Sequence, residues 1–175
     1  MKLVMRPRPE AAETALPPFE DVVGEHGAVV LRVCRSLLGR ADADDAWSDT
    51  FLAALRAYPQ LPPTSNVRGW LVTIAHHKSI DVARRSARAP RPVPEVPERT
   101  AAAPAPAGET LDEDLRARLL ALPPKQQAAV VYRYLADLSY GEVARLLRSS
   151  EAAARRSAAD GIAALRASLT EGVTA

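Results

Sequence analysis

The chain has little of several features that define common classes of protein. It contains one cysteine, Cys34, which excludes an intrachain disulfide and a structural zinc site built from several thiolates. No apolar run approaches the ~18 residues that mark a membrane-spanning helix. Residues 1–10 include arginines, but no apolar segment follows them, so we expect no secretory signal. These absences predict a cytoplasmic protein that does not insert into membranes.

Signatures of catalysis are also scarce. No glycine-rich phosphate loop and no nucleophile motif occurs. His76 and His77 are neighbours, so on a helix they point to different sides and are poorly placed to share a metal ion. His26 and Cys34 are too far apart on one predicted helix for shared chelation without other ligands. We therefore expect a protein that is not an enzyme, with no catalytic residues, metal site or cofactor.

Aromatic residues make up only 5% of the 175 residues, so the core must be built mainly from alanine, leucine, valine and isoleucine. A composition rich in alanine, leucine and arginine favours helix, and no alternation of apolar and polar residues predicts a strand. The formal net charge is only +2, but a mean near zero can hide opposite local patches. We predict an all-α protein.

Proline is frequent but clustered. The stretch 89–108 is dense in proline and alanine and lacks apolar periodicity, so neither a helix nor a central strand fits it. We predict a flexible or polyproline-like tether between domains that move semi-independently unless a partner or an interdomain contact fixes them. The predicted division is a disordered tail over 1–17, a helical domain over 18–88, a Pro/Ala-rich linker over 89–109 and a second helical domain over 110–170.

The first domain should hold three helices. Apolar residues recur at three- and four-residue intervals from Phe19 to Leu37, and Gly39 can end that helix. Asp42 stands where an N-cap would open the next helix. The apolar stripe of this second helix comprises Trp47, Phe51, Ala54, Leu55 and Tyr58. Prolines predict a loop over 59–66, and a third helix runs from near Asn66 to Arg88.

The second domain begins with a capping-box spacing at Thr110–Glu113, followed by leucines at helical intervals as far as Leu122. Two prolines interrupt the pattern. The helix after them carries an apolar stripe of Ala128, Val131, Tyr132 and Leu135.

Two further helices joined by a short turn follow. A second capping box, Ser139–Glu142, opens a helix to Leu147, and a turn over 148–150 leads into a helix over 151–169. This spacing is typical of a helix-turn-helix, although an ordinary helical hairpin has the same spacing. A recognition helix needs small residues at its crossing and basic residues toward a groove, and the candidates are Ala152, Ala153, Ala154, Arg155 and Arg156.

The first domain separates its charges. From Arg68 to Arg91 the charged residues are basic except for Asp81. Such a charged run can simply be a solvated helix surface. However, a domain with one acidic end and one basic end is suited to bind a basic protein and a polyanion at the same time. The loop over 59–66 could hold an unstacked base beside Trp70, although Trp70 also fits a core position. The acidic end, at the start of the second helix, comprises Asp42, Asp44, Asp45 and Asp49.

Three segments in this order, with the proline linker before the third, resemble extracytoplasmic-function sigma factors, the small two-domain type of bacterial RNA polymerase initiation factor. They read DADDAWSDTFLAALRAY from Asp42, NVRGWLVTIAHHKSIDVARR from Asn66 and LPPKQQAAVVYRYLADLSYGEVARLL from Leu122. The resemblance covers roughly residues 19–169 outside the linker. It implies a sigma region 2-like helical bundle and a sigma region 4-like helix-turn-helix domain.

The resemblance implies three binding surfaces. The surface for the β′ clamp helices of core RNA polymerase, the clamp surface, comprises Asp44, Asp45, Ser48, Asp49, Phe51, Leu52 and Leu55. The surface that reads the −10 element and traps a flipped base, the −10 surface, comprises Ser65, Asn66, Arg68, His76, His77, Lys78, Arg84, Arg85 and Arg88. The surface that reads the −35 element in the major groove, the −35 surface, comprises Ser149, Ser150, Glu151, Ala152, Ala153, Arg155, Arg156 and Ser157.

The resemblance also implies partners. These are core RNA polymerase, contacted at its β′ clamp helices and β flap, and promoter DNA in double-stranded and melted form. Such factors are commonly held silent by an anti-sigma factor, which this sequence does not identify. We expect a promoter-specificity factor that directs transcription initiation.

The chain departs from the family pattern in places. Members often have Gln-Glu at Ser48-Asp49 and Arg-Asn at His76-His77. Fewer cations on the recognition helix predict weaker phosphate binding and a smaller dependence on salt. A sigma-like DNA-binding regulator that does not support initiation is therefore an alternative, and a helical protein-interaction module is another. The recognition-helix positions that are often basic in the family are Ser157, Asp160 and Ile162.

Overall fold

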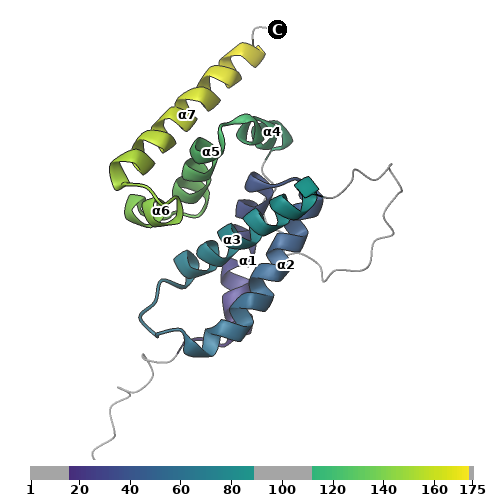
Figure 1. Ribbon diagram of the computed structural model, residues 1–175, viewed down its shortest axis with the longest axis vertical. Helices are drawn as coiled ribbons and strands as arrows, with labels where there is room; N and C mark the ends of the chain where they lie inside the picture. The colour runs from purple at the N-terminus through teal and green to yellow at the C-terminus, as the bar shows by residue number, and fades with distance from the viewer. Residues whose placement is uncertain (1–15, 89–111, 174–175) are drawn as a thin grey trace, which may run out of the picture.

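The computed structural model describes residues 16–88 and 112–173, and every regular element within those ranges is helical (Figure 1). The predicted all-α fold is confirmed. No helix in the described ranges is long and apolar enough to cross a membrane. The predicted N-terminal tail lies almost wholly outside the described residues, as does the predicted linker.

Three helices form the first domain: α1 (Phe19–Leu37), α2 (Arg40–Ala57) and α3 (Val67–Arg88). A short 3₁₀ turn, Tyr58–Gln60, follows α2. Alanines on the inner face of α2 let α1 and α3 approach it closely, since an alanine adds only a methyl group to the contact. Their joint core includes Val22, Val30, Ala43, Ala46, Ala54, Leu71 and Ala75.

The few aromatic residues of the first domain gather at one place. Phe19 packs edge-on against Tyr58 with ring centroids 5.2 Å apart, and Trp47 lies 4.8 Å from Phe51. The Trp47 indole N–H donates to the carbonyl of Gly27 at 2.9 Å, which joins α2 to α1. Because aromatic rings bury large areas and favour tilted contacts, this cluster fixes the angle between the two helices.

Two local predictions about α2 are wrong. Gly39, not Asp42, is the residue before the helix, and the Asp42 carboxylate instead accepts hydrogen bonds from the Ser86 hydroxyl at 3.0 and 3.1 Å. Leu55, which the apolar stripe placed in the core, is 51% exposed. Ala54 already occupies the buried position, and the next residue is turned about 100° around the helix axis.

The second domain contains α4 (Glu113–Ala121), α5 (Pro124–Val130), a π-helical turn (Val131–Leu135), α6 (Tyr140–Leu146) and α7 (Glu151–Val173). The capping box predicted at Ser139 is confirmed, since the Glu142 carboxylate accepts from the Ser139 backbone N–H at 2.8 Å. The box predicted at Thr110 falls partly outside the described residues. The N-cap of α4 is Asp112, whose carboxylate accepts from the Asp114 N–H at 3.2 Å.

The last helix crosses α5 at close range. A Cβ at Gly161 would lie 2.7 Å from Val130 Cγ2, so glycine permits the approach. Ala154 and Ala158 are buried at the crossing, whereas Ala152 and Ala153, predicted to be the small crossing residues, are exposed. The helix runs to Val173, beyond its predicted end at Leu169.

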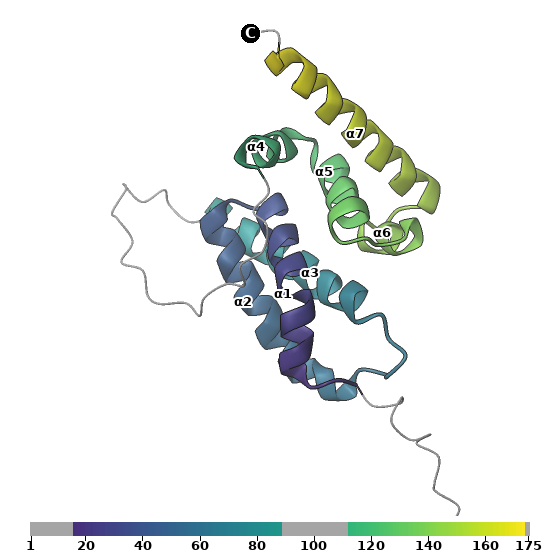
Figure 2. The same cartoon turned by 180° about the vertical axis from the view of Figure 1, so that it is seen from behind.

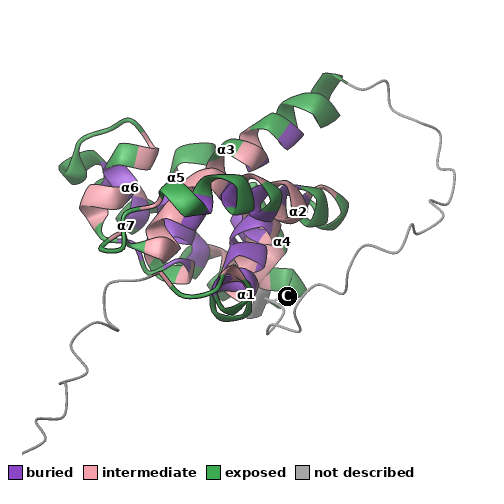
Figure 3. Ribbon diagram, turned by 90° about the horizontal axis from the view of Figure 1, so that it is seen from below, coloured by how far each residue is buried: buried purple, intermediate pink, exposed green. Residues whose placement is uncertain are grey.

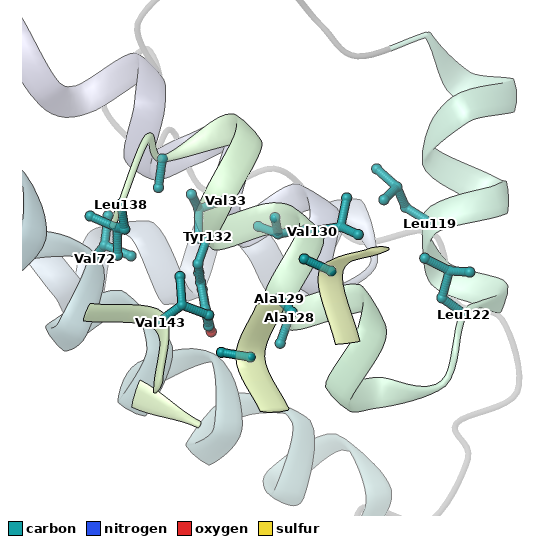
Figure 4. Close-up of a cluster of buried hydrophobic side chains, with 14 of the residues drawn as sticks. Val33, Val72, Leu119, Leu122, Ala128, Ala129, Val130, Tyr132, Leu138 and Val143 are labelled. Atoms are coloured by element: carbon teal, nitrogen blue, oxygen red, sulfur yellow. The ribbon is translucent and has the colours of Figure 1, made fainter. Parts of the chain in front are cut away.

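The two domains contact each other through α4, α5, the π-helical turn and α6. Both views place these elements between α1–α3 and α7 (Figures 1 and 2). Val33 of α1 and Val72 of α3 belong to the same buried cluster as Val131 and Tyr132 (Figure 4). The sequence predicted domains that move semi-independently unless a partner or an interdomain contact holds them. The structure contains such an interdomain contact.

Candidate nucleic-acid and protein interfaces

The clamp surface lies on the outer side of α2. Asp45 and Leu52 are seven residues apart and Leu52 and Leu55 are three apart, so the three share a face of the helix. Leu52 is 54% exposed and Leu55 is 51% exposed, which is unusual for large apolar side chains. Figure 3 shows exposed stretches along the outer faces of the helices while their inner faces are buried. This face combines carboxylates with apolar area, which suits docking against another protein.

The predicted clamp residues do not all reach the surface. Phe51 is only 7% exposed and packs between Phe19 and Trp47. It therefore supports α2 from behind, and its place in the predicted clamp surface is corrected. Ser48 and Asp49 are half-buried, and Asp44 and Asp45 are exposed.

Two of these carboxylates already hold arginines of their own domain. Asp44 accepts from Arg35 of α1 at 3.3 Å, and Asp49 accepts from Arg85 of α3 at 3.3 Å. Both pairs are solvent-accessible, and such pairs contribute little to stability. They tie the start of α2 to its neighbours, while Asp45 lies exposed beside them.

The −10 surface begins at the N-terminus of α3. The Asn66 side-chain carbonyl accepts from the Gly69 N–H at 3.1 Å, so Asn66 caps the helix. Its amide group donates to Glu142 of α6 at 2.7 Å. Arg68, in the first turn of α3, lies 4.0 Å from Asp137 of the second domain. Asn66 and Arg68 of the −10 surface therefore both contact the second domain.

His76 and His77 differ in their surroundings. His76 is half-buried, and its Nδ1 lies 2.6 Å from the Tyr132 hydroxyl. Burial lowers the pKa of His76, and the charges of His77 and Arg148 lower it further. His77 is exposed. In the described part of the chain no group of histidine, cysteine and carboxylate side chains could hold a metal ion.

The single thiol is not a reactive group. Cys34 is fully buried, next to the Ser79 hydroxyl at 4.0 Å. Burial raises the pKa of Cys34 to about 12. Because the thiolate is the reactive form, Cys34 acts as a core residue.

The basic end of the −10 surface follows at the C-terminal end of α3. Arg84, Arg85 and Arg88 are exposed, and Lys78, about two to three turns earlier, is half-buried. Cations are favoured at a helix C-terminus, which accounts for part of the pattern. The same positions present positive charge along one edge of the domain.

The −35 surface is the exposed start of α7 with the turn before it. The Ser150 hydroxyl accepts from the Ala153 N–H at 3.2 Å and caps the helix. Arg148 adopts a left-handed conformation, with φ of 48°, at the bend between α6 and α7. Ser157 is half-buried, and the other predicted residues of this surface are exposed.

Arg155 is held by two neighbours. It donates to the Glu151 carboxylate at 3.0 Å, and its guanidinium lies 4.6 Å from the ring centroid of Tyr140. Arg133 lies on the same ring at 5.3 Å and over the ring of the 54% exposed Tyr134 at 5.9 Å. The helical spacing of the sequence did not predict this group. The run YRYLADLSY, in which an arginine lies among three tyrosines, was the signal for it.

A cleft of about 860 Å³ separates α3 from α6. Its walls carry Asn66, His76 and Arg84 from the first domain and Glu142, Arg145 and Arg148 from the second. The fold therefore brings residues predicted for the −10 surface together with residues beside the helix-turn-helix.

Two family models match the chain. Sigma-70 region 2 matches residues 22–89, and Sigma-70, region 4 matches residues 112–165, so together they cover most of the chain. The chain belongs to the sigma-70 family. Together with the similarity to the ECF RNA polymerase sigma factor SigE described next, these matches confirm the predicted resemblance to extracytoplasmic-function sigma factors.

Named sigma factors are similar over parts of their length. The ECF RNA polymerase sigma factor SigE of Mycolicibacterium smegmatis is 32% identical over 142 residues, which are 77% of this chain and 55% of SigE. The RNA polymerase sigma factor YlaC of Bacillus subtilis is 30% identical over 116 residues, 60% of this chain and 64% of YlaC. The chain thus spans between half and two thirds of these relatives.

Solved structures share the fold. One is CnrH in complex with the cytosolic domain of CnrY, with a TM-score of 0.62, 23% identity, and coverage of 87% of this chain and 88% of CnrH. Another is the sigma factor RpoE in complex with the anti-sigma factor NepR from Bartonella quintana, with a TM-score of 0.70, 19% identity, and coverage of 87% and 96%.

Proposed function

We propose that this chain is a promoter-specificity factor that binds core RNA polymerase and directs it to promoters carrying a −10 and a −35 element. It would have no catalytic activity of its own and would act in the cytoplasm, where polymerase and DNA are. The observation that carries the proposal is the outer face of α2 in a domain that matches sigma region 2. Leu52 and Leu55 are exposed there beside acidic residues.

The clamp surface supplies both attraction and contact area. The carboxylates of Asp44 and Asp45 steer a basic partner surface during encounter. Leu52 and Leu55 are already about half covered, so burial of the rest of each side chain would contribute roughly 1 kcal/mol per leucine. The β′ clamp helices of core polymerase are the partner that the family assignment indicates.

The −10 surface would hold an unstacked base while the duplex melts. Extruding a base costs a few kcal/mol, which contacts in the protein must offset. Asn66 offers an amide, and Trp70 in the nearby cleft wall offers an aromatic face. Arg84 and Arg88 would bind backbone phosphates beside it.

The −35 surface would dock in the major groove through the start of α7. Arg155 presents a planar guanidinium that can bind guanine O6 and N7 together. Asp160 is exposed and acidic, and Ile162 packs against the core of its own domain. Neither adds a phosphate contact, so the dependence of −35 binding on salt should be shallow.

An anti-sigma factor is a further expected partner. Two proteins with this fold, CnrH and RpoE of Bartonella quintana, were solved with the cytosolic domain of CnrY and with the anti-sigma factor NepR. By analogy, a regulator of that kind would cover the apolar clamp surface of this chain.

Run-off transcription with core polymerase and a library of genomic fragments tests the proposal. We expect discrete transcripts that depend on the added chain. The depleted cation content of α7 favours a second candidate, a DNA-binding regulator that does not support initiation. Salt-sensitive DNA binding without any transcript, using polymerase that is active with another sigma factor, would favour that candidate and contradict the first.

A further inference from the structure

Arg155 of the −35 surface is held from a different helix. Its guanidinium lies 4.6 Å from the ring centroid of Tyr140, the first residue of α6, and it also donates to the Glu151 carboxylate of its own helix at 3.0 Å. We propose that Tyr140 is a positioning residue for promoter selectivity: its ring holds the Arg155 guanidinium in the orientation that reads a guanine of the −35 element. The inference rests on the proposed function, which gives Arg155 its role at the DNA.

The ring of Tyr140 is a fixed platform. Ser139, the residue before it, forms a complete capping box with Glu142, which sets the backbone where α6 begins. The Tyr140 side chain is half-buried and packs against the core of the second domain. Both views place α6 beside the start of α7 (Figures 1 and 2). Arg155 is thus held against a ring that belongs to the domain core, not to the recognition helix.

The same ring carries a second arginine, which has a different task. The Arg133 guanidinium lies 5.3 Å from the Tyr140 ring centroid. It also donates to the Leu138 carbonyl at 3.2 Å and to the Asp137 carboxylate at 3.3 Å. The Arg133 side chain is 34% exposed and that of Arg155 is 62% exposed. Arg133 therefore ties the start of α6 to the π-helical turn, and Arg155 is the more accessible of the two to DNA.

The ring contact supplies an orientation that the ion pair does not. The pair between Arg155 and Glu151 is solvent-accessible, so salt screens it and it restrains the side chain weakly. An aromatic face attracts a guanidinium and also stacks on its plane. Guanine O6 and N7 accept two hydrogen bonds from that plane, so its orientation decides how well one base is distinguished from another. A side chain that is already oriented also loses less conformational freedom on binding.

Variants of Tyr140 in the full-length chain, bound to core polymerase, test the proposal by selection of −35 sequences. Tyr140→Leu removes the ring, and discrimination at one base pair of the selected sequence should fall about fivefold. The slope of affinity against salt should not change, because every cation is retained. A role in stability alone would instead lower Tm and weaken binding to all sequences equally.

Two further variants separate the ring from its surroundings. Tyr140→Phe keeps the ring and removes the hydroxyl, whose hydrogen bond to Tyr134 raises the pKa of Tyr134. Base discrimination should be retained in Tyr140→Phe. Tyr134→Leu is the matched control, since its ring is 54% exposed on the same patch and lies near Arg133. This control should also keep the base preference of the wild type.

A double-mutant cycle shows whether Tyr140 acts through Arg155. In the Arg155→Lys background there is no guanidinium plane to orient, so adding Tyr140→Leu should cause no further loss of discrimination. An equal loss in both backgrounds would overturn the inference. Tyr140→Met repeats the test with a side chain that fills more of the ring's volume than leucine does, in case Tyr140→Leu lowers stability.

Nuclear magnetic resonance of arginine side chains in the free full-length chain provides a readout that needs neither polymerase nor DNA. The Arg155 Nε–H group should be restrained in the wild type and in Tyr140→Phe, and mobile in Tyr140→Leu. Equal mobility in the wild type and Tyr140→Leu would overturn the inference, as would an unchanged base preference of Tyr140→Leu. Co-elution with polymerase is measured in parallel. If it is retained, either result rejects only the role of Tyr140, whereas its loss in the wild type rejects the proposed function and this inference with it.

Discussion

The outer faces of α2 and α7 are both exposed and charged, but they differ in what they offer a partner. On α2, acidic residues stand beside Leu52 and Leu55. On α7, Ala152 and Ala153 leave the surface small and smooth, and Arg155 is already paired with Glu151. One face can bury apolar area, whereas the other relies on a few polar contacts.

This difference indicates that the two faces have different roles in binding. Apolar burial contributes more free energy than exposed ion pairs do, so α2 should provide affinity. A planar arginine contributes discrimination between bases, so α7 should provide selectivity. The chain would then bind polymerase firmly through its first domain and DNA weakly through its second, with polymerase holding both in place.

The largest effect should come from removing the apolar part of the α2 face. Leu52→Asp combined with Leu55→Asp should weaken binding to core polymerase by about a hundredfold, since burial of two leucines is lost. Fluorescence anisotropy with labelled chain measures this affinity. Leu169→Asp is the control, because Leu169 is 46% exposed on the other domain. Equal affinity of the double variant and wild type would move the polymerase interface off α2.

The second-largest effect should come from disturbing the close crossing of α7 and α5 at Gly161. Gly161→Ala places a Cβ 2.7 Å from Val130 Cγ2, and overpacking of this kind costs about 1–3 kcal/mol. Thermal unfolding should show a lowered Tm, and −35 binding should weaken while polymerase binding is retained. Gly24→Ala is the control, since no neighbouring atom lies within 4 Å of its added Cβ. That change should stabilise α1 by about 0.5–1 kcal/mol.

Arg155 should govern selectivity more than affinity. Arg155→Lys keeps the charge but loses the planar fork, so discrimination at one base pair of the selected −35 sequence should fall by about tenfold. The slope of affinity against salt should stay the same, since the number of cations is unchanged. Selection of bound sequences with the polymerase complex, before and after the substitution, measures this. An unchanged base preference would assign Arg155 to phosphate binding.

Charge reversal on α2 should have the smallest effect. Asp45→Lys with Asp49→Lys should slow association with polymerase by a few-fold, and the effect should shrink as salt increases. Stability should change by less than about 1 kcal/mol, because the Asp49–Arg85 pair is solvent-accessible. Stopped-flow association at two salt concentrations separates long-range electrostatic steering, which salt screens, from short-range contacts, which it does not. A loss of affinity that is independent of salt would contradict a steering role.

Local patterns in the sequence predicted much of the fold. The apolar spacing from Phe19 to Leu37 matches the bounds of α1, and the Ser139 capping box starts α6 as predicted. Such features depend on residues three or four positions apart, which a sequence displays directly. The N-cap position of α2, Gly39, was missed because Asp42 bonds to a distant serine, Ser86.

Contacts between side chains that are far apart in the sequence could not be predicted from it. Phe51 and Leu55 both fit an apolar stripe, and only packing against Phe19 and Trp47 decides that Phe51 is the buried one. The contact between His76 and Tyr132 joins residues 56 positions apart on different domains. No periodicity encodes such a pairing, so the domain contact is a finding of the structure alone.

Co-migration with core RNA polymerase on a sizing column tests the central claim most directly. We expect co-elution of the wild-type chain at near-equal stoichiometry and loss of co-elution for the Leu52→Asp/Leu55→Asp variant. A folded wild-type chain, free of any inhibitor, that elutes apart from polymerase would contradict a polymerase-binding role.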